Sequence, residues 1–239
     1  MRISDLSFSL IGSVINFLYP SACPSCSNPT DNLTFAPFCS ACWRSMEHYA
    51  GPSCSICGIP LVSSCADRCR ACLKSPPVFS RASFFGLYDA TLASVVHHYK
   101  FLGIRRLSKP LADLLMFYDT TGIDALISVP LSPRSLKDRG FNQALLLAAA
   151  LSRKKRLPLI IDGLRKVADT PPQVGLSAKE RAANVKKAFV CTNKVSGMNI
   201  LLIDDVMTTG ATVNACAQQL RRSGARSINV LTLARASLL

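Results

Sequence analysis

The sequence has few acidic residues, no long apolar run and no familiar nucleotide-binding loop. It contains 14 Asp and Glu against 28 Lys and Arg in 239 residues, a formal net charge of +14. Such a balance attracts polyanions, for example nucleic acid or phosphorylated metabolites. The absence of roughly 20 consecutive apolar residues predicts that no transmembrane segment is present. The absence of G-x-x-x-x-G-K-[ST] and of a dinucleotide fingerprint argues against those two classes of nucleotide site.

The first 22 residues are interpreted as a separate segment. They hold an apolar stretch, but Asp5 interrupts it and no small-residue cleavage site precedes the first cysteine. We therefore expect residues 1–22 to form an amphipathic helix and the protein to be cytoplasmic. Attachment of this helix to the inner face of the membrane is the alternative.

Cysteine, by contrast, is abundant and clustered. Nine of the 11 cysteines fall between Cys23 and Cys72. Eight of them form Cys-x-x-Cys pairs separated by 12, 11 and 11 residues, namely Cys23, Cys26, Cys39, Cys42, Cys54, Cys57, Cys69 and Cys72. Because each such turn aims two thiolates at one tetrahedral ion, the pairs predict structural Zn²⁺ in a reducing compartment.

The spacing leaves the number of zinc ions and their ligand sets open. Consecutive pairs would form two four-cysteine units, whereas interleaved pairs would join the first with the third and the second with the fourth. Cys65 is a spare thiol that could replace a ligand, and Cys191 and Cys216 are expected in the core. Residues 23–77 lack the apolar periodicity of an independent core, so metal would stabilise this zinc-binding region.

Residues 78–239 alternate apolar runs with helix-like segments, which predicts an α/β domain around a parallel sheet. The expected strands are Phe84–Tyr88, Ala125–Val129, Ile200–Ile203 and Ser227–Leu233. The expected helices are Ala90–Phe101, Leu107–Tyr118, Gln143–Leu151 and Thr212–Arg222, the last followed by Gly224 at its C′ position.

The most informative stretch is Asn199–Thr212, "NILLIDDVMTTGAT". Two carboxylates, Asp204 and Asp205, follow a buried strand, and a Thr/Gly loop then opens a helix. The loop consists of Thr208, Thr209, Gly210, Ala211 and Thr212. Its N–H and hydroxyl groups suit a phosphate, while the carboxylates suit sugar hydroxyls. The pattern predicts a ribose 5-phosphate site, because helix capping alone would use a single residue.

The segment "LLIDDVMTTGAT" resembles the 5-phosphoribosyl-1-pyrophosphate motif of the type I phosphoribosyltransferases. Together with "VPLSPRSLKDRGFNQA", "TPPQVGLSAKERAANVKKAF" and the cysteine pairs, the chain resembles the ComF family of bacterial proteins linked to competence. The resemblance implies a parallel sheet with helices on both faces behind a zinc-binding region. It also implies that Asp204 and Asp205 are catalytic and hold the ribose of phosphoribosyl pyrophosphate, which binds with Mg²⁺.

The same resemblance suggests further ligand contacts. Val129 and Pro130 would lie in a pyrophosphate loop, and Arg139 would neutralise the diphosphate with help from neighbouring cations. Asn142 would face this anion or, alternatively, cap the following helix. Residues 165–181 resemble a loop that closes over the substrate, and the contacts assigned there are Gln173 and Arg181. Lys100 is another candidate for the anion, whereas His97 and His98 are expected on a helix surface.

Two functions are compatible with these residues. The first is a ComF-like protein that binds phosphoribosyl pyrophosphate and acts in DNA uptake, with single-stranded DNA and helicase or recombination proteins as partners. The second is an active phosphoribosyltransferase, a pentosyl-transferring enzyme, with an unidentified acceptor and no DNA role. The sequence does not decide between them, nor does it fix the oligomeric state.

Overall fold

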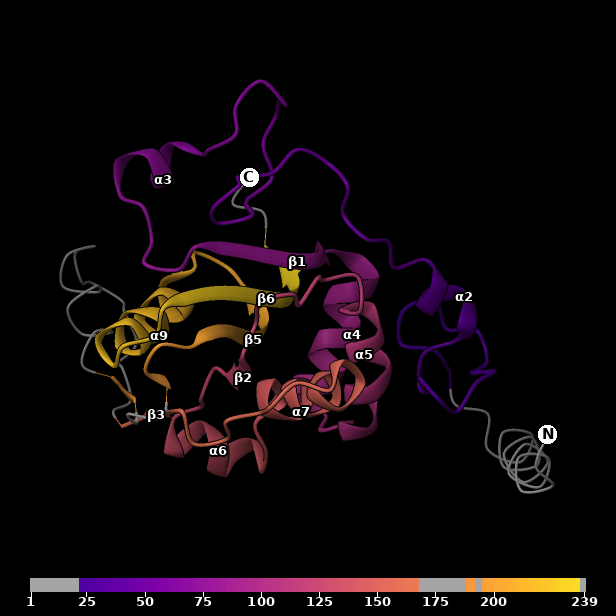
Figure 1. Cartoon of the computed structure of the whole chain (residues 1–239). Helices are drawn as coiled ribbons and strands as arrows, with labels where there is room; N and C mark the ends of the chain where they lie inside the picture. The colour runs from indigo at the N-terminus through magenta and orange to yellow at the C-terminus, as the bar shows by residue number, and fades with distance from the viewer. Residues whose placement is uncertain (1–21, 168–187, 192–194, 237–239) are drawn as a thin grey trace.

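The structure, a computed structural model, describes residues 22–167, 188–191 and 195–236 (Figure 1). Its centre is a four-stranded parallel sheet in the order β1-β6-β5-β2. The strands are β1 (Arg81–Leu87), β6 (Ser227–Arg235), β5 (Asn199–Met207) and β2 (Ala125–Ser128). Their inner residues form nearly continuous apolar runs, as expected for parallel strands that are covered on both faces.

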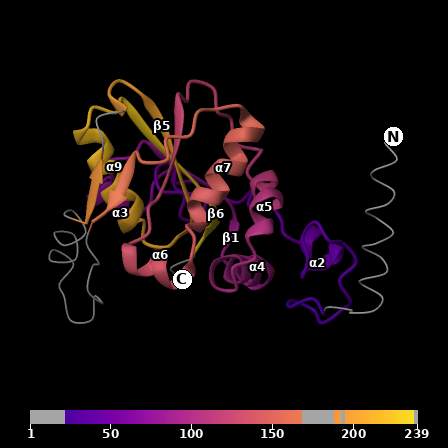
Figure 2. The same ribbon diagram turned by 90° about the horizontal axis from the view of Figure 1, so that it is seen from below.

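Helices cover both faces of this sheet, which confirms the predicted fold class. One face packs against α4 (Ala90–Phe101), α5 (Ser108–Leu114) and α7 (Gln143–Lys155), and the other against α9 (Ala211–Arg222) (Figures 1 and 2). A short antiparallel pair, β3 (Leu164–Lys166) and β4 (Phe189–Cys191), joins the α9 side. Two further short helices of this domain are η1 (Arg105–Leu107) and α6 (Pro133–Arg139).

Several predicted boundaries differ from the structure, and one helix was not expected. Strand β5 continues past Ile203 to Met207, because β6 still pairs with it there. Helix α5 ends at Leu114, where i→i−3 hydrogen bonds from Leu115 and Met116 tighten the chain into a turn. Helix α6 was not expected. It begins with Pro133 after the capping residue Ser132 and ends at Arg139, with Gly140 as its C-cap at a φ of 71°.

The extended β5 changes the position of the carboxylate pair. Strand β2 ends at Ser128, opposite Ile203, whereas β5 runs on. Asp204 and Asp205 therefore lie in the second half of β5, beyond the end of its β2 neighbour. They still occupy the carboxyl edge of the sheet, where parallel α/β folds bind ligands.

The cysteine-rich region consists of two similar units. Each has a Cys-x-x-Cys turn followed by a short helix, α2 (Ser40–Arg44) or α3 (Arg70–Lys74), which a cysteine caps. The first turn places Ser27 at φ 62° and the second places Gly58 at φ 68°. The first unit lies beside α4 and α5, and the second lies against β1 and the α9 side of the sheet (Figures 1 and 2).

Within the described ranges, no helix is long and apolar enough to cross a membrane. Residues 1–21 lie outside those ranges, so the amphipathic helix expected over residues 1–22 stays a prediction.

Candidate functional site

The carboxylate pair at the end of β5 faces two different neighbours. Asp205 is 2% exposed. Lys100 Nζ of α4 lies 3.2 Å from its Oδ2 and donates to its Oδ1 at 3.4 Å. Asp204 is partly buried and, following the alternation of a strand, lines a small cavity on the loop side. One carboxylate is therefore paired with a lysine, and the other faces the Thr/Gly loop.

The surroundings of Asp204 shift its pKa. Burial raises the pKa of Asp204 well above its ordinary value, and the neighbouring Asp205 charge raises it further. The Lys100 ammonium lowers this pKa, but it does not offset burial and the second carboxylate. Burial, with a smaller contribution from Asp205, likewise raises the pKa of Tyr99. The site thus favours a ligand that brings positive charge or hydrogen-bond donors to the carboxylates.

The loop between β5 and α9 has the geometry of an anion cradle. Gly210 has a φ of +80°, and a Cβ there would lie 2.6 Å from Met207 Cε. Thr209 Oγ1 accepts a hydrogen bond from Ala211 N at 3.4 Å. The next N–H groups, in the first turn of α9, have no carbonyl of a preceding helical turn to donate to. A cavity of about 40 Å³ lies between the loop and Asp204. Exposed hydroxyls and helix-start amides therefore surround a space suited to a small anion.

The loop after β2 lies beside the same carboxylates. Val129 N donates to Ile203 O at 2.9 Å, directly before Asp204. Asn142 caps α7 by accepting from Leu145 N at 3.2 Å, and its Nδ2 donates to Val129 O at 3.1 Å. The capping alternative for Asn142 is therefore confirmed, and its contact with an anion stays a prediction. Pro130 continues this loop and is partly buried.

Two of the predicted cations meet at one aromatic ring. The Arg139 guanidinium lies 5.0 Å from the ring centroid of Phe101, and Lys100 Nζ lies 5.9 Å from the same centroid. Phe101 is 56% exposed. Arg139 and Lys100 thus converge on Phe101, although they come from α6 and α4, and Lys100 also pairs with Asp205. The other two cations of α6, Arg134 and Lys137, are exposed.

Several buried polar atoms at this site lack a partner. In the described part of the chain, four buried side-chain atoms make no hydrogen bond: Arg139 Nη1, Gln143 Oε1, Asp205 Oδ2 and Gln218 Oε1. The first three belong to residues at this site, because Gln143 follows Asn142 and its carbonyl accepts from Tyr99 Oη at 2.8 Å. Lys100 reaches Asp205 Oδ2 at ion-pair distance only. A buried polar group without a partner costs about 1–3 kcal/mol, so a polar ligand that paired with these atoms would be stabilised here.

Sequence reasoning missed Tyr99, Phe101 and Gln143. Gln143 lies inside the quoted "VPLSPRSLKDRGFNQA" segment, but only the fold shows that it is 3% exposed and that its Oε1 makes no hydrogen bond. The two predicted contacts in the closing loop, Gln173 and Arg181, lie outside the described residues and stay predictions.

The cysteine pairs form two separate sets. Cys23, Cys26, Cys39 and Cys42 lie with all Sγ atoms within 4.8 Å of one another, and so do Cys54, Cys57, Cys69 and Cys72. Cys26 and Cys39 Sγ are 3.6 Å apart, and Cys57 and Cys69 Sγ are 3.7 Å apart. A tetrahedral Zn²⁺ with Zn–S bonds of 2.3 Å separates its sulfurs by about 3.8 Å. Both sets therefore fit zinc.

Consecutive pairing is therefore correct and the interleaved alternative is wrong. Cys65 is exposed and belongs to neither set. Cys216 is buried, as expected of a core residue, and Cys191 is partly buried. Burial raises the pKa of Cys23 and of Cys54, but backbone N–H donors outweigh it and lower each to about 7. Each set thus offers a thiol that readily becomes a metal-binding thiolate near neutral pH.

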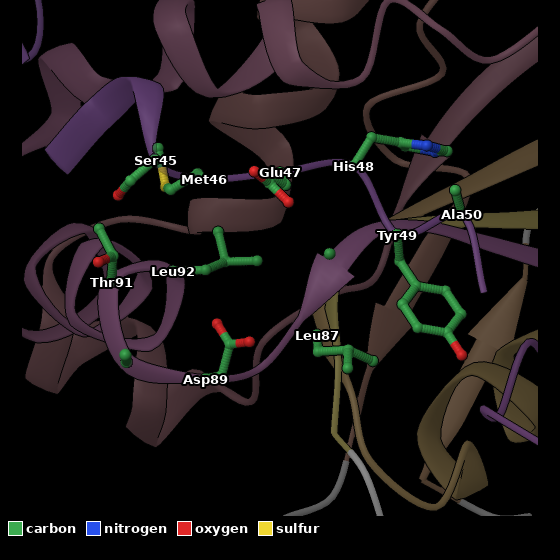
Figure 3. A pocket seen from close by; sticks show the side chains of 12 residues that line it. Ser45, Met46, Glu47, His48, Tyr49, Ala50, Leu87, Asp89, Thr91 and Leu92 are labelled. Carbon is green, nitrogen blue, oxygen red and sulfur yellow. The ribbon is translucent and has the colours of Figure 1, made fainter. Parts of the chain in front are cut away.

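A cavity of about 470 Å³ lies elsewhere in the described part of the chain (Figure 3). The linker between the two cysteine units forms one wall and carries Glu47, and the turn from β1 into α4 forms the other and carries Asp89. Among the described residues, none of those predicted for the phosphoribosyl site lines it. Asp89 and Lys100 are separated by about 16 Å along α4, at 1.5 Å per residue. This distance excludes the cavity from direct chemistry at the carboxylate pair.

A parallel α/β sheet with a carboxylate pair and a Thr/Gly loop, joined to two four-cysteine units, defines a phosphoribosyltransferase-type protein with a double zinc ribbon. Comparison with family models agrees. Residues 14–73 match the double zinc ribbon domain, and residues 141–237 match the phosphoribosyl transferase domain.

The chain belongs to the ComF family of competence proteins. It is 34% identical over 224 residues to competence protein F of Haemophilus influenzae, covering 88% of this chain and 96% of that protein. Identity to DNA utilization protein YhgH of Escherichia coli K12 is also 34% over 224 residues, covering 90% and 97%. Competence protein ComFC of Bacillus subtilis is 29% identical over 208 residues, covering 82% and 83%.

Proposed function

We propose that this protein binds 5-phosphoribosyl-1-pyrophosphate at the end of β5. The amides and hydroxyls of residues 208–212 would hold the 5-phosphate, and Asp204 and Asp205 would hold the ribose hydroxyls. Lys100 and Arg139 would contact the diphosphate. The observation that carries the proposal is the buried ion pair of Asp205 and Lys100 at the end of β5, directly before the Thr/Gly loop, where Asp205 Oδ2 makes no hydrogen bond.

The same residues suit Mg²⁺ as a companion of the ligand. Carboxylate oxygens are hard donors, and Mg²⁺ is commonly bound by one or two carboxylates together with substrate phosphates. Asp205 Oδ2 is a buried oxygen with unused acceptor capacity. Bound there with the ligand, Mg²⁺ would neutralise part of the diphosphate charge.

The site also contains what phosphoribosyl transfer requires of a protein. Loss of pyrophosphate from C1 builds positive charge in the sugar ring and negative charge on the leaving group. Fixed charges assist such a step, and no protein nucleophile is required. Lys100 and Arg139 would stabilise the leaving group, while the two aspartates keep the ribose in place. The alternative function, an active transferase with a metabolic acceptor and no DNA role, uses this same arrangement.

For the biological role we favour DNA uptake in the cytoplasm. The names of the relatives refer to competence and DNA utilization. The net charge of +14 suits a polyanion, and the exposed Phe101 ring beside Arg139 and Lys100 offers a stacking surface among cations. Single-stranded DNA is therefore the proposed partner, together with helicase or recombination proteins that handle it.

Thermal unfolding tests the ligand assignment. Phosphoribosyl pyrophosphate with Mg²⁺ at 100 times its Kd should stabilise the protein by about 2.7 kcal/mol, which corresponds to a rise in Tm of roughly 5–10 °C for a chain of this length. The double variant Asp204→Asn/Asp205→Asn should lose this rise. Asp113→Asn, which changes an exposed carboxylate on α5, should keep it. An unchanged Tm of the wild-type protein would rule out the assignment.

A further inference from the structure

Two arginines attach the two cysteine units to the sheet domain. Arg106, in η1, donates from Nε and Nη2 to Ala36 O of the first unit at 3.2 and 2.9 Å. Arg235, the last residue of β6, donates from Nε to Cys57 O of the second unit at 3.2 Å. The side chains differ in setting, because Arg106 is exposed and Arg235 is 2% exposed.

Arg235 has a second set of partners that Arg106 lacks. Its Nη1 donates to Met207 O at 2.9 Å and also to Thr208 O. These carbonyls lie where β5 passes into the phosphate loop, and Met207 is the strand partner of Arg235. One buried guanidinium therefore bridges a metal-binding turn and the start of the loop.

This contact fixes the direction of the loop amides. In a trans peptide the C=O and N–H groups point in opposite directions. Because the carbonyls of Met207 and Thr208 point towards Arg235, the amides of Thr208 and Thr209 point away from it. A cavity of about 200 Å³ lies on the side of Arg235 and Cys57, and the cavity at Asp204 shares Met207, Gly210 and Ala211 with it but is also lined by Thr208 and Thr212. The N–H groups of Thr208 and Thr209 therefore point away from the second cysteine unit and are available to the ligand.

Further contacts make the second unit part of the same assembly. Cys57, Cys69 and Cys72 line the 200 Å³ cavity together with residues 209–211 of the loop. Asn214 Oδ1 of α9 accepts a hydrogen bond from Val78 N, in the segment that leaves the unit, at 2.8 Å. Cys57 provides both a thiol of the metal set and the carbonyl that Arg235 binds. A change in this turn would therefore act directly on the loop.

We propose that Arg235 is a positioning residue that couples the metal at the second cysteine set to the phosphate loop. Ligand at the loop and Zn²⁺ at the second set stabilise one another, whereas Zn²⁺ at the first set is independent of the ligand. Thermodynamic linkage makes this coupling reciprocal. The inference rests on the proposed function, because it assumes that the loop binds the phosphate of phosphoribosyl pyrophosphate.

Zinc release from the full-length wild-type protein tests the coupling without any substitution. The protein, with two Zn²⁺ per chain as the two sets predict, is mixed with a chromogenic chelator, and release is followed with and without phosphoribosyl pyrophosphate and Mg²⁺. We expect the ligand to slow release of one equivalent by about fivefold or more and to leave the other unchanged. Equal protection of both equivalents, or of neither in a protein that binds the ligand, would overturn the inference.

Substitutions of Arg235, with Arg106 as the matched control, then test whether Arg235 carries the coupling. Arg235→Gln should weaken the affinity for the ligand about tenfold and abolish its protection of zinc, whereas Arg106→Gln should change neither. Arg235→Lys keeps the charge without the planar fork and should show the same losses. Wild-type affinity in a folded Arg235→Gln or Arg235→Lys protein would contradict the role of Arg235. Absence of binding by the wild-type protein would instead refute the proposed function itself.

Discussion

At the scale of single residues, the site depends on charges that are buried together. Asp205 and Lys100 are the best example, since their side chains are 3% and 23% exposed and their charged atoms lie 3.2 Å apart. A buried charge that loses its partner is strongly disfavoured, whereas an exposed pair contributes little. The ion pair thus holds α4 against β5 and keeps the Asp205 carboxylate inside the protein.

Lys100→Met should lower the free energy of unfolding by roughly 3 kcal/mol, because Asp205 is then buried without a counterion. Adding Asp205→Asn should recover most of this loss, since no buried charge is left. Lys154→Met, which breaks the more exposed pair with Asp113, should cost less than about 1 kcal/mol. Urea unfolding gives the free energy of unfolding of the wild type and of the three variants. Equal costs for the two lysine substitutions would contradict the description of Asp205 as a buried, dependent charge.

Asp204→Asn should stabilise the ligand-free protein at neutral pH by about 1 kcal/mol. Folding raises the pKa of Asp204 above its ordinary 3.8, so the unfolded chain ionises first as the pH rises. Wild type and variant should therefore have similar Tm values below about pH 4. A gap of a few degrees should open above that pH, with the variant more stable. A gap that appears only at acid pH, or one of opposite sign, would contradict the raised pKa.

Many of these residues could be predicted because neighbouring residues in the sequence are enough to recognise them. The carboxylate pair, the Thr/Gly loop and the cysteine pairs are short motifs whose chemistry follows from adjacent residues. Arg235, Gln143 and Tyr99 could not be found this way, because their partners are distant in sequence. Arg235 contacts Cys57 across 178 positions and Met207 across 28.

At the scale of structural elements, the loop between β5 and α9 depends on the backbone of Gly210. Its φ of +80° lies in the left-handed region, which costs an L-residue roughly 1–2 kcal/mol. Gly122 offers a matched comparison, since its φ is +75° and a Cβ there would have no neighbour within 4 Å. Replacing either glycine with alanine would strain the backbone in the same way. Only Gly210, however, lies in the loop between β5 and α9.

Gly210→Ala and Gly122→Ala should both lower stability by roughly 1–2 kcal/mol. Only Gly210→Ala should also weaken binding of phosphoribosyl pyrophosphate, by about tenfold or more, because the new Cβ lies at the loop and against Met207. Chemical denaturation and calorimetric titration separate the two effects. Equal ligand affinity in both variants would mean that the loop does not form the binding surface.

Element boundaries were less predictable than the elements themselves. The apolar run Ile200–Ile203 predicts a strand, but its continuation through two aspartates requires β6 as a partner. Helix α6 is short and lies in a segment interpreted as a loop, although Ser132 and Pro133 together form a helix-start signal. The pairing of the cysteine turns was left open because equal spacings fit both arrangements; the fold joins consecutive turns.

At the scale of the whole molecule, the two cysteine units differ in their relation to the sheet. The first packs beside α4 and α5, away from the Thr/Gly loop of residues 208–212. The second lies against β1 and shares a cavity with that loop. A parallel sheet and a net charge of +14 were predictable from composition and pattern. The position of each unit was not, because it is set by contacts between segments far apart in the chain.

The excess positive charge should make single-stranded DNA binding strongly dependent on salt, with a slope of about −0.7 per phosphate contacted. Phe101→Ala should weaken binding about tenfold through loss of stacking and should leave the slope unchanged. Phe117→Ala removes another exposed ring, 46% exposed and packed near His48, and should have little effect. Fluorescence anisotropy at several salt concentrations measures the affinity for single-stranded DNA and its salt slope. Weak binding that is flat with salt would contradict a DNA role.

The central claim is that the end of β5 binds phosphoribosyl pyrophosphate, and calorimetric titration of the wild-type chain tests it most directly. We expect one site per chain in the presence of Mg²⁺, weaker binding without the ion, and no detectable heat with Asp204→Asn/Asp205→Asn. A wild-type protein that is folded and zinc-loaded, yet shows no binding with Mg²⁺ present, would contradict the account.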